Sequence, residues 1–355
     1  MIAAANVAAD TAADTNLRIA FWRVDFGARG PGDALAQISA ERPHTTAMAQ
    51  VIARLKPDIL VLSGVDYDMG NATLGSMRAL IGAQGHELRH IFAPVPNAGV
   101  PSGMDLNGDG IIHGPDDAYG YGEFAGARAL AVLSRYPFDL DTLRDFTRFP
   151  WRDLPNAKLY TGATAKALAQ HRLPSKAQVE LPVAISDQTV LRLLIYHAGP
   201  PVFGFHPDRN QNRNHDETAF WVQLLDGQLP YPPPKRPFVL IGGSNLDPFD
   251  GDGIHTAMRD LLDHPALQDP QPSSLGGAAQ RDPAHLGPPQ LDTVNWDEPQ
   301  GNLRVSYVLP SVDVVVTGAG VWWPLPSDDD AQLLSQTQTR HKPVWVDLSF
   351  RARPV

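Results

Sequence analysis

The sequence contains no cysteine, which excludes disulfide bonds, thiolate metal ligands and a cysteine nucleophile. It also has no apolar run near the roughly 18 residues that a membrane-spanning helix requires. The sequence has fewer basic than acidic residues: 29 Lys and Arg against 39 Asp and Glu, which gives a net charge of -10. We therefore expect no membrane span and no non-specific binding of nucleic acid, although a local basic patch can still bind an anion.

The first 16 residues also lack something, namely the apolar core and basic flank of a signal peptide. They are rich in alanine and are interrupted by Asp10 and Asp14. We interpret residues 1–16 as a mobile tail, with the remnant of a removed signal as the alternative. No linker or repeat divides the remainder, so residues 17–355 are predicted to form a single domain.

The apolar segments that are present alternate with helical patterns along the whole chain. Helices are expected at 44–56 and 214–225, the second with Asn214 as its N-cap and Glu217 three residues later, close to a capping box. This mixture is typical of an α/β protein with two packed sheets and helices outside them. Strands are expected at 17–24, 59–62, 88–92, 128–134, 177–184, 190–197, 235–243, 303–311, 312–318 and 343–350.

Seven segments, in order, resemble the endonuclease/exonuclease/phosphatase superfamily. They include "PDILVLSGVDYD", "DRNQNRNHDETAFW", "VLIGGSNLDPFDGDG" and "NLRVSYVLPS", and together they extend from Leu17 to Leu348. The resemblance implies a four-layer α/β sandwich of two mixed sheets flanked by helices. It also implies a relationship to enzymes that cleave phosphate esters with a divalent metal ion.

The resemblance assigns eight positions to metal binding and catalysis, and only three of them keep the family residue. The survivors are His197, Asn245 and His341. The other five, with the family residue in parentheses, are Arg23 (Asn), Gly64 (Glu), Gly243 (Asp), Ser306 (Asp) and Arg340 (Asp).

These substitutions remove four carboxylates and introduce two guanidinium groups, so they make the expected pocket positive. A pocket with Arg23 and Arg340 beside two histidines should repel Mg²⁺ or Mn²⁺ and attract a small anion or a phosphate ester. We further expect Arg209, Asn214 and His215 to line a nearby rim, unless they form a loop and helix cap that hold each other in place.

Three functions remain open. The leading hypothesis is a pseudoenzyme: an anion-binding pocket in a former phosphoesterase, with little or no turnover. The second is an active metal-dependent phosphodiesterase or nuclease that uses displaced carboxylates, for which Asp25, Asp66 and Asp247 are the candidates. Asp commonly caps turns just past strand ends, and this interpretation of the three aspartates is the preferred one. The third is a structural or partner-binding domain, so the sequence leaves open whether the protein is an enzyme.

A separate segment, "DLNGDGIIHGPD", fits the template of a calcium-binding loop. Gly110 would supply the sharp turn at its sixth position. The alternative is a solvated acidic turn. A structural Ca²⁺ ion favours a periplasmic or secreted location, where weak sites are filled. The predicted ligands are Asp105, Asn107, Asp109, the backbone carbonyl of Ile111, and Asp116.

Overall fold

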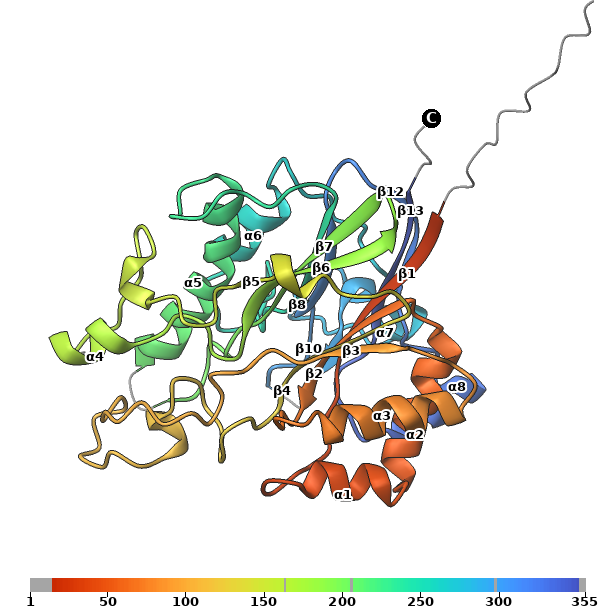
Figure 1. Ribbon diagram of the computed structural model, residues 1–355, viewed down its shortest axis with the longest axis horizontal. Helices are drawn as coiled ribbons and strands as arrows, with labels where there is room; N and C mark the ends of the chain where they lie inside the picture. The colour runs from red at the N-terminus through yellow and green to blue at the C-terminus, as the bar shows by residue number, and fades with distance from the viewer. Residues whose placement is uncertain (1–14, 163, 205–206, 297–298, 351–355) are drawn as a thin grey trace, which may run out of the picture.

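The computed structural model describes residues 15–162, 164–204, 207–296 and 299–350. Most of the predicted tail, residues 1–14, lies outside these ranges. Within them, two large β-sheets face each other, and helices cover their outer faces (Figure 1).

The first sheet has six strands in the order β12-β13-β1-β2-β4-β3. Strand β1 is parallel to β2 and antiparallel to β13, so the sheet is mixed. The second strand is buried along its whole length, as its apolar composition predicts. The strands are β1 (Thr15–Arg23), β2 (Ile59–Val65), β3 (His90–Phe92), β4 (Ala129–Ser134), β12 (Val315–Val321) and β13 (Val344–Phe350).

The second sheet has five strands in the order β11-β8-β7-β6-β5. Strands β6 and β7 form the antiparallel pair that the sequence predicts, and β7 is parallel to β8. Two short strands, β9 (Val294–Asn295) and β10 (Asn302–Leu303), pair with each other beside this sheet. The strands of the second sheet are β5 (Arg144–Asp145), β6 (Gln178–Ser186), β7 (Thr189–His197), β8 (Phe238–Gly243) and β11 (Ser306–Pro310).

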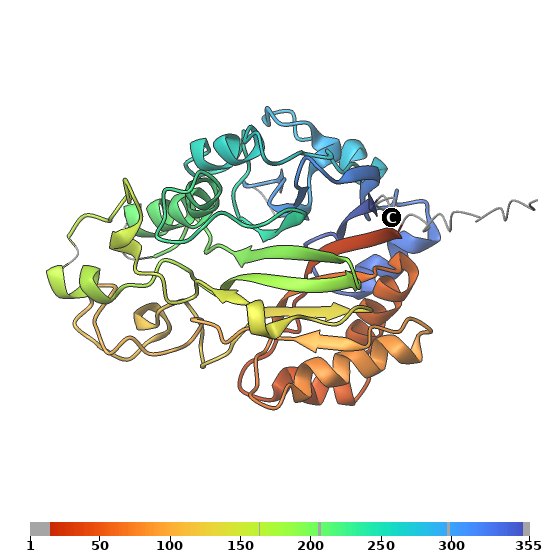
Figure 2. The same ribbon diagram turned by 45° about the horizontal axis from the view of Figure 1, so that its top comes forward.

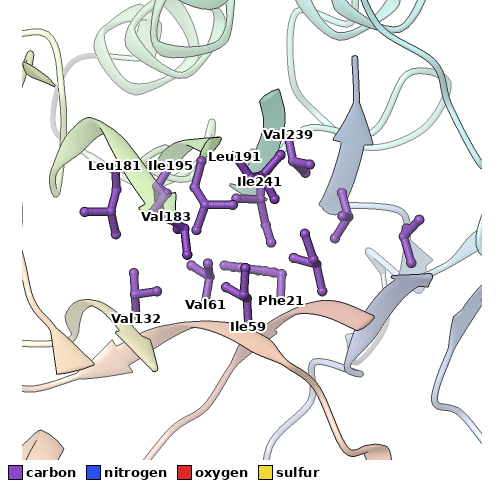
Figure 3. Close-up of a cluster of buried hydrophobic side chains, with 14 of the residues drawn as sticks. Phe21, Ile59, Val61, Val132, Leu181, Val183, Leu191, Ile195, Val239 and Ile241 are labelled. Carbon is purple, nitrogen blue, oxygen red and sulfur yellow. The ribbon is translucent and has the colours of Figure 1, made fainter. Parts of the chain in front are cut away.

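The main core lies between the two sheets. Phe21, Val61 and Val132 extend from the first sheet toward Ile195 and Ile241 of the second, and all five are fully buried (Figure 3). Alternate residues of a strand share a face, so these side chains come from the inward positions of their strands. Burial of this apolar layer is the main term that holds the sheets together.

A different set of helices covers the outer face of each sheet (Figure 2). The apolar side chains of four helices pack on the first sheet, and those of α5 and α6 pack on the second. The covering helices are α1 (Asp33–Ser39), α2 (Pro43–Leu55), α3 (Ala72–Ala83) and α8 (Asp329–Gln336) on the first sheet, and α5 (Pro207–Leu225) and α6 (Thr256–Leu262) on the second. The remaining short helices are α4 (Ala165–Gln170), α7 (Leu275–Ala279), and the 3-10 turns Pro115–Asp117, Leu140–Thr142, Trp151–Asp153 and Pro289–Leu291.

The predicted α/β sandwich of two mixed sheets is confirmed, but the predicted start of α5 is wrong. The helix begins at Pro207 and not after Asn214. Its first turns are polar, and tertiary contacts stabilise them; for example, Arg213 Nε donates to the carbonyl of Leu173 at 2.9 Å. Local propensity contains no information about such contacts.

Candidate functional site

The ends of four strands meet between the two sheets and form the candidate site. Strand β1 ends at Arg23, which is in register with Ser63 of β2. Strand β7 ends at His197, which is in register with Gly243 of β8. The ring centroids of Phe21, from the first sheet, and His197, from the second, lie 6.2 Å apart. Loops and strand ends held by two rigid sheets are a common setting for binding residues.

Arg23 and His341 contact each other directly. The guanidinium Nη1 of Arg23 lies 3.0 Å from Nε2 of His341. A guanidinium only donates, so the imidazole Nε2 accepts and His341 is neutral. Burial and the charge of Arg23 lower the pKa of His341 well below its usual range. The other ring nitrogen, Nδ1, is buried without a hydrogen-bond partner.

His197 is also buried and neutral, with only 3% of its surface exposed. The side-chain amide of Asn245 donates to the carbonyl of Ala198 at 2.7 Å, and its nitrogen lies 3.3 Å from His197 Nε2. Burial lowers the pKa of His197 well below its usual range, and the charges of Lys176 and Arg23 lower it further. Its Nδ1 has no hydrogen-bond partner.

Lys176 is the cation at this site that the sequence analysis missed. It lies two residues before β6, and its Nζ donates to Ser63 Oγ at 3.2 Å and to the carbonyl of Arg128. Burial lowers the pKa of Lys176 well below its usual range, and the guanidinium groups of Arg23 and Arg128 lower it further. Lysine is mostly exposed in proteins, so a lone lysine before a strand gives no signal in the sequence.

Two of the positions at which the family resemblance places a carboxylate are closed by neighbouring atoms. Gly64 has a φ of +99°, and a Cβ atom there would lie 1.9 Å from the carbonyl oxygen of Val24. At Gly243 a Cβ atom would lie 2.6 Å from Nδ1 of His197. Ser306, a third such position, is buried and in register with Gly243. A larger side chain at Gly64 would require the backbone at Val24 to shift, and one at Gly243 would require the ring of His197 to shift.

The three aspartates considered as displaced metal ligands accept hydrogen bonds from backbone amides. Asp25 Oδ1 accepts from Gly27 N at 2.9 Å, and Asp247 Oδ1 accepts from Phe249 N at 2.7 Å. Asp66 Oδ1 accepts from Arg128 N at 2.9 Å, whereas its Oδ2 is buried without a partner. These bonds are those of turn caps just past strand ends.

The second predicted arginine does not lie at the buried centre of the site. Arg340 is exposed, and its guanidinium carbon lies 5.8 Å from the ring centroid of Trp296. The same indole meets the ring of His341 edge-on at 5.3 Å. Arg340 is thus on the outer side of His341, and Lys176 supplies the second inner cation.

The predicted rim residues hold neighbouring segments together. Asn214 Nδ2 donates to the carbonyls of Gly199 and Ser244, both at 2.7 Å, and so ties α5 to the segments after β7 and β8. His215 Nδ1 lies 2.8 Å from Asp216 Oδ1. Asn214 therefore has the structural role that the sequence analysis gave as the alternative. Its side chain binds backbone carbonyls of other segments and does not cap its own helix.

Glu217 is part of the same framework and not of a capping box. It accepts hydrogen bonds from the backbone and hydroxyl groups of Ser175 and from Gly199 N. Burial raises the pKa of Glu217 to about 7. The residue thus anchors the segment that leads to Lys176.

The predicted calcium loop is closed by its own hydrogen bonds. Asp105 accepts from Gly108 N at 2.5 Å and from Gly110 N at 2.9 Å, and Asp109 Oδ1 accepts from Ile111 N at 2.7 Å. Across the described part of the chain, no three His, Asp or Glu side chains are grouped so that they could hold a metal ion.

Arg209 connects the ends of this loop and does not reach the strand-end site. It donates to the carbonyls of Leu106 and Asp116, both at 3.2 Å. The guanidinium therefore closes the loop from the side of α5.

Two surface cavities lie beside these features. One, of about 430 Å³, is next to the end of β1 and includes Asp25, His44 and Gln338 in its lining. The other, of about 310 Å³, lies under the loop and includes His113, Asp117 and Glu123. No helix among the described residues is long and apolar enough to cross a membrane.

Comparison with known proteins identifies relatives of this architecture. Residues 20–328 match the model of the Endonuclease/Exonuclease/phosphatase family. A solved structure from Beutenbergia cavernae with that description is 18% identical, with a TM-score of 0.56, and the match covers 96% of this chain and 73% of the other. A family protein from Bacteroides thetaiotaomicron is 14% identical, with a TM-score of 0.50, covering 96% of this chain and 100% of the other. No curated protein matches the chain. At these identities the structural likeness concerns the fold.

Proposed function

Because the chain belongs to the endonuclease/exonuclease/phosphatase family, we propose that its strand-end site is a former phosphoesterase centre that now binds a small anion, with little or no turnover. The ligand is a phosphate-like group or a phosphate ester. The observation that carries the proposal is the pair of basic side chains, Arg23 and Lys176, beside two neutral histidines. Lys176 contacts Ser63, which precedes Gly64, a position at which the family resemblance places a carboxylate.

The chemistry of these side chains supports an anion as the ligand. Arg23 uses one guanidinium nitrogen on His341, and Lys176 contributes its amine. Both side chains are partly exposed, as is Asn245, whereas the two histidines are buried below them. The Nδ1 atoms of the two histidines are buried, so the contacts to an anion would come from the partly exposed basic side chains.

A divalent cation does not fit the same residues. Mg²⁺ is held by carboxylate and other oxygen ligands, and the positions at Gly64 and Gly243 have no side chain and no room for one. Arg23 and Lys176 would repel a cation. We therefore derive no catalytic step through a metal ion.

One observation favours the competing function, a metal-dependent phosphodiesterase. Asp66 Oδ2 is a buried carboxylate oxygen without a partner, and burial raises the pKa of this group. Asp25 lies in the same neighbourhood, since its charge stabilises the cationic form of Arg23. Two carboxylates with separate turn-capping bonds are a weaker set of ligands than the family pattern requires.

The test is titration of the full chain with inorganic phosphate at low ionic strength, followed by calorimetry or NMR. Loss of one charge-assisted hydrogen bond costs about 1.5–3 kcal/mol. We therefore expect Arg23→Met and Lys176→Met each to weaken binding by about tenfold or more. The exposed Arg281→Met and Lys235→Met serve as matched controls and should change binding less than about twofold.

A parallel assay measures hydrolysis of a generic phosphodiester with Mg²⁺ or Mn²⁺. We expect no turnover that depends on the site. Metal-dependent turnover that His197→Ala abolishes would overturn the proposal in favour of the competing function. Phosphate binding that survives both methionine variants would remove the anion site altogether.

A further inference from the structure

Arg128 lies at the same sheet edge as the candidate site. It immediately precedes β4, which is antiparallel to β2 and therefore starts where β1 and β2 end. In the register of the sheet, Arg23 pairs with Ser63. Ser63 pairs in turn with Leu130, two residues after Arg128. The carbonyl of Arg128 also accepts a hydrogen bond from Lys176 Nζ, so three basic residues from three segments adjoin one another at this edge.

The backbone of Arg128 has a conformation that suits glycine better than arginine. Its φ is +49°, in the left-handed region. The conformation is fixed from both sides, because the backbone N–H donates to Asp66 Oδ1 at 2.9 Å and the carbonyl accepts from Lys176 Nζ. Glycine would make the same two bonds without strain. An arginine at such a position indicates that its side chain has a use.

The ion pair that this side chain makes does not account for the strain. Nη2 of Arg128 donates to Glu123 Oε2 at 2.6 Å, and the two side chains are 34% and 44% exposed. A pair with this exposure contributes little to stability, because water and salt screen it. Burial, the charge of Arg23 and then the charge of Arg128 lower the pKa of Lys176, so the guanidinium of Arg128 also acts on the site. Arg128 is therefore a cation beside the anion site whose present partner holds it weakly.

We propose that Arg128 is a third binding residue of the anion site, and that its guanidinium exchanges between Glu123 and the ligand; this inference rests on the proposed function. A dianion gains most from a third cation, because the attraction grows with the charge of the ligand. A bound anion also favours the charged form of Lys176, which the neighbouring cations disfavour. The site should therefore prefer phosphate monoesters, which carry about two negative charges at pH 8, over singly charged phosphodiesters.

The experiment compares the binding of methyl phosphate and dimethyl phosphate to the full chain at pH 8 and low ionic strength, by calorimetry or NMR. We expect the wild type to bind methyl phosphate at least about tenfold more tightly, the equivalent of one charge-assisted hydrogen bond. Arg128→Gly removes the guanidinium and keeps the left-handed backbone. It should weaken binding of methyl phosphate by about tenfold and binding of dimethyl phosphate by less than about threefold.

Glu123→Gln should have the opposite effect. It removes the carboxylate that competes for the guanidinium, so methyl phosphate should bind about two- to fivefold more tightly than to the wild type. Glu123 is partly exposed, so this variant tests the inference even if Arg128→Gly does not fold. Glu87→Gln is the matched control, because it breaks an exposed ion pair with Arg89 near the opposite end of β4. It should change binding by less than about twofold.

A purely structural role for Arg128 predicts a different pattern. Arg128→Gly would then bind both esters as the wild type does, whereas Arg128→Ala, which keeps the strain, would weaken both equally. That result, or no gain in affinity from Glu123→Gln, would overturn the inference and leave the anion site in place. If the wild type binds neither ester, the proposed function itself fails.

Discussion

Gly64 provides the sharpest test of how closely the candidate site is packed. It occupies the position at which the family resemblance places a metal-binding glutamate. In the structure it sits at an irregularity in the pairing of β2 with β4, with φ of +99°. A Cβ atom there would lie 1.9 Å from the carbonyl oxygen of Val24, a contact that requires the backbone to move.

We expect Gly64→Ala to destabilise the protein by about 3 kcal/mol or more. A side chain held in a sparsely populated backbone conformation costs about 1–3 kcal/mol. Overpacking of a buried site adds about 1–3 kcal/mol. The contacting atom belongs to the backbone of Val24, just after β1, and Val24 N donates to Ser63 O at 2.9 Å. The clash therefore cannot be relieved by rotation of a side chain.

The assay is unfolding in urea or guanidinium chloride, with the free energy of unfolding taken from the midpoint and slope. Gly75→Ala is the matched control, because Gly75 lies inside α3 with open space around its Cα. It should stabilise the protein by about 0.5–1 kcal/mol, since alanine favours a helix over glycine. If Gly64→Ala lies within about 1 kcal/mol of the wild type at an unchanged slope, the closed backbone at this position is wrong.

Three further predictions concern the surroundings of the site. Burial and the charges of Asp247 and Asp250 raise the pKa of Asp292 to about 8, so its contribution to stability falls as pH rises from about 4 to 8. In Asp292→Asn, the free energy of unfolding should therefore differ less between pH 5 and pH 8 than in the wild type. The same difference in both proteins would contradict this prediction. Calcium should raise the melting temperature of the wild type and not of Asp105→Asn, and equal curves with Ca²⁺ and with EDTA would leave the loop a solvated turn. Trp22→Phe removes the indole N–H that donates to the carbonyl of His341 at 3.0 Å, and it should destabilise the protein by about 2 kcal/mol. It should also weaken phosphate binding. If neither stability nor phosphate binding changes, His341 is held in place by other contacts.

Much of the fold could be predicted from the sequence, because the apolar composition of the strand segments and their order along the chain indicate the sheets. The buried strands at 59–65 and 238–243 are continuous apolar runs that end in glycine and polar residues. Helix boundaries were harder to predict where polar residues are ordered by distant partners. The first turns of α5 are an example, since Arg209 and Arg213 donate hydrogen bonds to backbone carbonyls that lie far away in the sequence.

The candidate site could be predicted only in part, for a physical reason. Residues at strand ends, such as Arg23 and His197, could be placed from order along the strands. Lys176 could not, because its approach to Ser63 depends on how the second sheet lies over the first. Arg340 follows the motif position but points outward over Trp296, and nothing in its spacing distinguishes it from an inward residue.

The two glycines at the site are each constrained by a neighbouring residue. A side chain at Gly243 would contact the ring of His197, whose position is in turn fixed near Asn245. A side chain at Gly64 would require the backbone at Val24, just after β1, to shift. A carboxylate side chain introduced at either glycine is therefore expected to cost stability.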